Sequence, residues 1–199
     1  MKHWLMGFGL AAVTGGAVSC HSPEREAQEQ SRHVVDSILP PEVTLQRFRE
    51  GLPPAESLAG GSSSRDKLVR TFMTALAQRD TAALADMSIS RAEFAYLYYP
   101  NTAQALSPYG LEPALMWQLL FEKSDRGIRR ALQKYGGRRT RLLSYDCGNE
   151  ASQEGENTIW GPCTVRFASP GGDTASVRFF SQIIGRDGHY KFLSYSNKL

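Results

Sequence analysis

The distribution of apolar positions divides the chain into a helical part and a strand-rich C-terminal quarter. Between Asp66 and Tyr135 apolar residues recur at helical spacing. From Thr140 onwards they gather in aromatic and β-branched runs separated by Gly or Asp, which predict strands at 141–147, 158–168, 174–185 and 189–196. The pattern therefore predicts an α+β fold in which N-terminal helices pack on a C-terminal antiparallel sheet of about four strands.

Several segments carry both a helical stripe and a start signal. An approximate capping box of Ser63 and Asp66 precedes one apolar face, made of Leu68, Val69, Phe72, Met73 and Leu76. Asp80 is the expected cap of a short helix at 81–87. Ser90 and Glu93 form a second capping box before Glu93–Tyr99. We expect a helix there, although its aromatic residues also suit a strand.

The region from Glu112 to Gly137 predicts two further helices, the first at 112–122 and the second starting at Ser124 or Asp125. The second has an apolar stripe of Ile128, Ala131, Leu132 and Tyr135, with Arg126, Arg129, Arg130 and Lys134 on the opposite face.

The N-terminus has the features of an export signal. Residues 4–18 follow Lys2 without a single charge, and they are too few and too rich in glycine to span a membrane comfortably. They end in Ala17-Val18-Ser19-Cys20, which resembles the lipobox of bacterial lipoproteins. The resemblance implies cleavage before Cys20 and a diacylglycerol on its sulfur, so that the mature protein is held at the membrane of the cell envelope. An ordinary secretory signal and an uncut anchor are the alternatives.

The resemblance also bears on the regions that follow. Ser22 is typical of lipoproteins sent to the outer membrane, here on its periplasmic face. We expect a signal peptide at 1–19, a tether at 20–64 and a globular domain at 65–199. The tether would hold helices from Ser22 to about Leu39 and at 42–50, then a linker rich in Gly, Ser and Pro. It is either a plain spacer or, at Val43–Leu52, a docking peptide for a partner or for the protein's own domain.

The two remaining cysteines predict a structural disulfide. An exported protein lies in an oxidising compartment. In a hairpin centred near Gly155, Cys147 and Cys163 lie opposite each other. A metal site is disfavoured because no histidine lies nearby to complete a tetrahedral shell, and a redox role lacks the Cys-x-x-Cys spacing. No metal or other cofactor is expected.

Basic residues are concentrated in one stretch, although the net charge is only +3. Residues 123–141 hold eight basic residues and one acid, hence +7, while the rest of the chain after residue 19 holds 14 and 19, hence −5. This stretch is either a solvated helix face or a contact for anionic lipid or another envelope polyanion. Nucleic acid is discounted as a partner, because the compartment is wrong and no aromatic residues are interleaved with the charges. The candidate contact residues are Arg126, Arg129, Arg130, Lys134, Arg138, Arg139 and Arg141.

The order of elements resembles the NTF2-like or SnoaL-like superfamily, with Leu68–Leu84 as its helix pair followed by the strands from Thr158 onwards. The resemblance implies helices packed into a curved sheet around an apolar pocket, with a strand at Glu93–Tyr99. Candidate pocket residues are Tyr96, Tyr99, Trp117 and Asp146. His189 is a poor candidate base because it adjoins the expected turn at Asp187-Gly188.

The sequence contains no nucleophile elbow, phosphate loop, HExxH or paired-acid motif. We therefore expect a lipid-anchored envelope protein of the non-enzymatic binding type, with the membrane as a partner through Cys20 and an envelope protein or anionic lipid as a further one. The first alternative is an NTF2-like ligand carrier or enzyme. The second is a peripheral membrane adaptor that uses the basic helix face.

Overall fold

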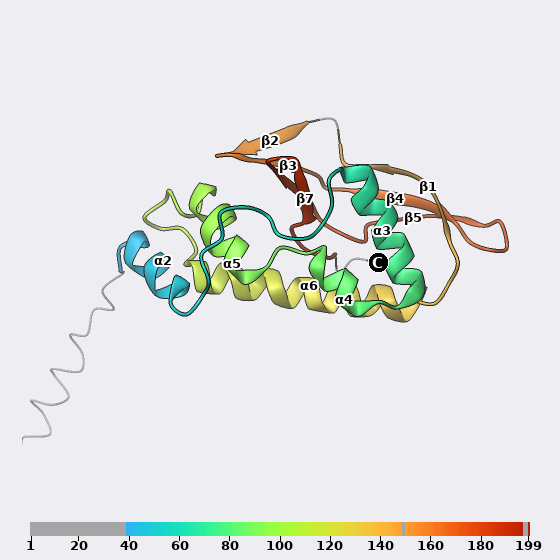
Figure 1. The fold of residues 1–199 in the computed structure, drawn as a ribbon, viewed down its shortest axis with the longest axis horizontal. Helices are drawn as coiled ribbons and strands as arrows, with labels where there is room; N and C mark the ends of the chain where they lie inside the picture. Colours follow the sequence, from blue (N-terminus) through green and yellow to red (C-terminus); the bar gives the residue numbers. More distant parts are fainter. Residues whose placement is uncertain (1–38, 149, 197–198) are drawn as a thin grey trace, which may run out of the picture. The chain divides into compact units, whose positions relative to one another are not determined.

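In the computed structural model, which describes residues 39–148, 150–196 and 199, helices come first and strands last. The α+β prediction is confirmed (Figure 1). The expected signal peptide, Cys20 and the first tether helix lie outside the described residues. The helices are α2 (Pro41–Arg49), α3 (Arg65–Gln78), α4 (Thr81–Asp86), α5 (Arg91–Glu93), the π-helix η1 (Phe94–Tyr98), the 3-10 helix η2 (Tyr99–Asn101) and α6 (Pro113–Tyr135).

The predicted helix starts are largely correct. Asp80 caps α4 by accepting a hydrogen bond from the Ala83 N–H, and Ser90 and Glu93 form the predicted capping box of α5. The cap of α3 differs by one residue, because Ser64 rather than Ser63 accepts from the Lys67 N–H. All five predicted apolar residues of α3 are buried.

The prediction of two helices between 112 and 137 is wrong, because α6 is continuous. Ser124 does not cap a new helix; its hydroxyl instead accepts the Tyr195 N–H at 3.0 Å. A Cβ at Gly127 would lie 2.5 Å from the Ser196 carbonyl oxygen. Gly127 therefore serves a close approach of the C-terminal segment to α6, and does not end a helix.

Among the described residues, seven strands form two antiparallel sheets, in the orders β1-β4-β5 and β2-β3-β6-β7. The predicted strands at 158–168 and 174–185 are each divided into two, and β2 was not predicted. The strands are β1 (Arg141–Asp146), β2 (Ala151–Glu154), β3 (Asn157–Trp160), β4 (Thr164–Ala168), β5 (Thr174–Val177), β6 (Ile183–Arg186) and β7 (His189–Phe192).

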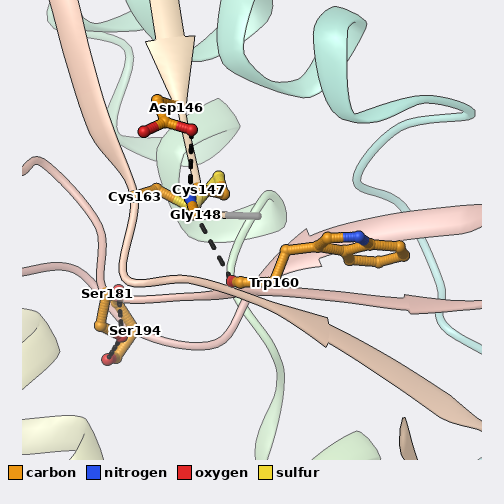
Figure 2. The surroundings of a disulfide bond; sticks show 7 residues. All are labelled: Asp146, Cys147, Gly148, Trp160, Cys163, Ser181 and Ser194. Carbon is orange, nitrogen blue, oxygen red and sulfur yellow. Dashed lines mark hydrogen bonds between the residues drawn. A yellow bond between two sulfur atoms is a disulfide. The ribbon is translucent and has the colours of Figure 1, made fainter. Parts of the chain in front are cut away.

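The division of the strands has a local cause between β3 and β4. Pro162 has no N–H to give to a ladder, so the pairing is interrupted and the chain passes from one sheet to the other. On the facing side, β1 ends at Asp146, which pairs with Thr164. The predicted disulfide between Cys147 and Cys163 lies at this junction (Figure 2).

The core consists of two aromatic clusters. Phe72 of α3 centres the first, with ring centroids 5.3 to 5.8 Å from those of Phe179, Phe180, Phe192 and Tyr195. Phe94 of η1 centres the second, against Phe48, Tyr98, Tyr99 and Trp117. The members of both clusters lie between Leu45 and Leu199, within the compact unit 39–199.

The expected boundary at 65 and the expected flexible linker therefore differ from the structure, which places residues 39–64 on the folded unit. Phe48 is 5% exposed and packs edge-on against Phe94, while Leu58 is 3% exposed. The Arg49 side chain donates to the Ala95 carbonyl and covers the Tyr96 ring. These contacts fit the interpretation of Val43–Leu52 as a segment that docks on the protein's own domain.

Residues 93–99 are helical throughout. The Glu93–Tyr99 strand that the NTF2-like resemblance implies is therefore not formed. The aromatic side chains of residues 93–99 pack in the second cluster, where Phe94 is fully buried and Tyr99 is 2% exposed.

Candidate functional site

An apolar groove runs between α4 and α6, with a volume of about 490 Å³. This volume lies in the range of small-ligand pockets. In Figure 1, α4 lies beside the middle of α6. Apolar side chains make up most of the walls: Leu84, Ile89, Trp117, Phe121, Ile128 and Leu132.

Two sets of contacts fix the α4 wall of this groove to the core. On the α4 side, Ile89 donates its N–H to the Phe192 carbonyl, and Phe192 donates to the Met87 carbonyl, so the segment after α4 is attached to β7. On the floor, the Tyr195 hydroxyl donates to the Leu84 carbonyl at 2.6 Å. The groove is therefore bounded by backbone that is fixed to the core.

The polar groups of the groove are largely engaged within the protein. Ser124 accepts from the Tyr195 N–H, and Ser90 accepts from the Glu93 N–H. Asp125 and Arg129 form an ion pair on the rim. Burial, with a smaller contribution from the Asp86 charge, raises the pKa of the Tyr195 hydroxyl well above its ordinary value, so this group is neutral at physiological pH. Such a lining suits the binding of an apolar body better than proton transfer.

The four predicted pocket residues are not gathered in this groove; only Trp117 lines it. Tyr99 donates its hydroxyl to the Leu111 carbonyl at 2.8 Å, and Tyr96 lies beneath the Arg49 guanidinium. Asp146 is exposed, and its carboxylate accepts the Gly148 N–H in a turn beside the disulfide (Figure 2). The prediction that Asp146 belongs to a pocket with the tyrosines is therefore not supported by its position.

The predicted basic face is partly neutralised along α6. Arg126 pairs with Glu122, Arg129 pairs with Asp125, and Lys134 lies 5.3 Å from the centroid of the Tyr135 ring. Arg130 and Arg138 are exposed.

The end of the basic stretch is arranged differently. Arg139 and Arg141 line a hollow of about 680 Å³ together with Arg70 of α3. None of these three arginines forms an ion pair with an acid among the described residues. Sequence reasoning missed Arg70, which is distant in the chain and joins the other two only through the packing of α3 against β1.

The groove itself could have been found from the sequence if α6 had been treated as one helix. Trp117, Phe121, Ile128 and Leu132 are separated by four, seven and four residues, so they share one face of a continuous helix. The expected helix boundary between 122 and 124 divided this stripe in two.

His189 is exposed beside the hairpin turn, where Asp187 has a positive φ of 50°. Within residues 39–148, 150–196 and 199, no group of three His, Cys, Asp or Glu side chains is arranged to hold a metal ion. Nor does any helix of that part have the length and apolar character needed to cross a membrane.

Comparison of the chain with protein-family models, with curated proteins and with solved structures gives no significant match.

Proposed function

We propose that this protein is a lipid-anchored cell-envelope protein of the binding type, whose folded part takes up a ligand with an apolar body in the groove between α4 and α6. The observation that carries the proposal is the groove itself, about 490 Å³ of space between mainly apolar walls. Binding in such a groove is favourable because apolar surfaces of the ligand and of the walls are removed from water.

The chemistry of the groove favours binding over catalysis. Its Tyr195 and Ser124 hydroxyls are used to hold the C-terminal segment, and its carboxylate, Asp125, is paired with Arg129. The charged lining residues are Arg91, Arg129 and Asp125, so the groove keeps one net positive charge that an anionic head group on the ligand would meet. A fatty acid or another single-chain anionic amphiphile has both features.

The anchor is the second part of the proposal. It rests on the lipobox-like sequence Ala17-Val18-Ser19-Cys20 after an uncharged apolar run. A thioether-linked diacylglycerol on Cys20 would hold the protein at the envelope membrane, with the outer membrane favoured by Ser22. The disulfide between Cys147 and Cys163 is consistent with an oxidising compartment.

The first alternative, an NTF2-like ligand carrier, would also require an apolar cavity. The location differs, because this groove lies between helices and not inside the curve of a sheet. The enzyme form would require a buried acid or base in the cavity, and the groove's own carboxylate is at the rim in an ion pair.

The ligand proposal is tested with a dansyl-labelled fatty acid, whose emission is excited by energy transfer from Trp117 at the groove. Ala85 lines the groove and Ala82 on the same helix does not, while both are exposed. We expect saturable binding that is about tenfold weaker in Ala85→Phe, because the ring fills the groove, and unchanged in Ala82→Phe. Non-saturable binding, or equal binding by both variants, would contradict the proposal.

The anchor is tested by mass spectrometry of the protein purified from membranes. We expect the mature chain to begin at Cys20 and to carry acyl groups, and Cys20→Ala to remain unprocessed. A mature chain with an unmodified cysteine would indicate an ordinary secretory signal instead.

A further inference from the structure

Exposed apolar side chains are concentrated beside the start of α6. Among the described residues eight large hydrophobic side chains are exposed, and six of them lie between residues 106 and 121. Five of these form what we call the apolar surface: Leu106, Tyr109, Leu111, Leu115 and Leu119. Leu106 is 79% exposed and Tyr109 is 89% exposed, so the loop before α6 presents two large apolar side chains almost fully to solvent.

This loop is held in place by hydrogen bonds. The buried Tyr99 donates its hydroxyl to the Leu111 carbonyl at 2.8 Å, and the Leu111 N–H donates to the Gln104 side chain at 2.9 Å. A Cβ at Gly110 would collide with the Gln104 carbonyl oxygen, so Gly110 permits this turn. The exposure of Leu106 and Tyr109 is thus a property of a fixed turn.

The apolar surface continues into positive charge along the same face of α6. From Leu115 and Leu119 the next side chains on that face are Lys123, Arg126 and Arg130, at steps of four, three and four residues. All five are exposed. The rise of an α-helix places Arg130 about 22 Å from Leu115 along the axis. One face of one helix therefore has an apolar half and a basic half, and its acid Glu122 is paired with Arg126.

We infer that this face of α6 and the preceding loop dock on a bilayer that contains anionic phospholipid. Leu106, Tyr109 and the two leucines of α6 would enter the boundary between head groups and acyl chains, where tyrosine is favoured. Lys123, Arg126 and Arg130 would lie against the anionic head groups. Charge complementarity favours a lipid surface over a protein partner. The apolar surface matches the acyl region of a leaflet, and the adjoining basic residues match its anionic head groups.

The inference does not depend on the apolar groove. The groove opens beside Trp117 and Ile128, whereas Leu115 and Arg126 project from a different side of α6. Nor does it depend on Cys20, because the contact belongs to the folded part. Beside the two acyl chains of a diacylglycerol on Cys20, such a surface would add a second contact with the membrane and fix the orientation of the domain.

The test uses the chain from residue 21 to residue 199, which lacks the apolar run and the thiol of Cys20. Its sedimentation is measured with vesicles of phosphatidylcholine alone and with vesicles that also contain phosphatidylglycerol. We expect binding only to the anionic vesicles. The variant Leu106→Ser/Tyr109→Ser should bind at least about tenfold less, and Lys123→Gln about fivefold less. Leu143→Ser, at a leucine of β1 that is 37% exposed, is the matched control and should bind like the wild type.

Circular dichroism of each variant checks that the fold is retained, which we expect because all four substituted residues are exposed. Equal binding to both kinds of vesicle would overturn the electrostatic part of the inference. Full binding by the double variant in the loop would overturn the insertion part. If the chain instead forms a dimer that the loop variant abolishes, and binds no vesicles, the surface is a protein interface and the inference is wrong.

Discussion

Glu93 and Lys191, which are 98 residues apart in the chain, form a buried ion pair with the ammonium nitrogen 3.1 and 3.0 Å from the two carboxylate oxygens. Both side chains are at most 4% exposed. The carboxylate also accepts the N–H groups of Ala59 and Ser90, and the ammonium donates to the Ala59 carbonyl. This network joins the segment before α3, the start of α5 and strand β7, and it satisfies the charges that it buries.

Replacing Lys191 with methionine should cost about 3–5 kcal/mol of unfolding free energy, because the Glu93 carboxylate would remain buried without its counter-charge. The double variant Glu93→Gln/Lys191→Met should lose less than the sum of the two single variants. Urea denaturation measures both effects. Glu122→Gln, which breaks the exposed pair with Arg126, is the control and should change stability by about 0.5 kcal/mol or less. A small effect of Lys191→Met would show that the network is not a stabilising junction.

The disulfide closes a loop with a sequence separation of 16 residues between Cys147 and Cys163. In the chain-entropy model a loop of that length contributes about 3 kcal/mol by restricting the unfolded chain. We expect Cys147→Ser/Cys163→Ser to lower the free energy of unfolding by this order, as measured by urea denaturation. Reduction of the wild-type protein should have the same effect and should not change the stability of the double variant.

Gly127 lies inside α6, where alanine would ordinarily raise helix stability by about 1 kcal/mol. Here the added Cβ would meet the Ser196 carbonyl oxygen at 2.5 Å. Gly127→Ala should therefore destabilise the protein by about 1–3 kcal/mol, because the C-terminal segment must move away from α6. Thermal unfolding compares it with Gln133→Ala, at an exposed position of the same helix that should change stability little. Stabilisation by Gly127→Ala would contradict the close packing.

Glu154 at the end of β2 should make stability depend on pH. Its Oε2 atom is buried without a hydrogen-bond partner among the described residues, and burial raises the pKa of this carboxyl above its ordinary value. Because the folded state then keeps its proton to a higher pH than the unfolded state, stability falls as pH rises from the ordinary carboxyl pKa through the raised one.

Glu154→Gln removes this titration, so the fall in the urea midpoint between acidic and neutral pH should be smaller in the variant than in the wild type. Glu150→Gln, at an exposed acid four residues earlier, is the control and should keep the wild-type profile. Identical profiles for Glu154→Gln and the wild type would show that this carboxyl is solvated in the folded protein.

The candidate site shows where sequence reasoning succeeds and where it stops. The apolar side chains of α3 and the cap at Asp80 were predictable because helical period and capping act over a few residues. The groove was missed because Ser124 and Asp125 have the features of a helix start in the sequence. Only the contact of Ser124 with Tyr195 and the close approach of Ser196 to Gly127 show that this part of α6 packs against the C-terminal segment. Asp146 seemed suited to a pocket by its place beside Cys147, but the junction of the two sheets leaves it in solvent.

The sequence by itself determined the fold class, the helix caps at Asp80 and Ser90 and the pairing of Cys147 with Cys163, because each depends on local propensity, on period or on the symmetry of one hairpin. The tertiary structure alone decided the docking of Phe48 on Phe94 and the position of Arg70 beside the same hollow as Arg139. These depend on contacts between segments far apart in the chain, whose free energies are set by burial in a shared core and leave no periodic trace in either segment.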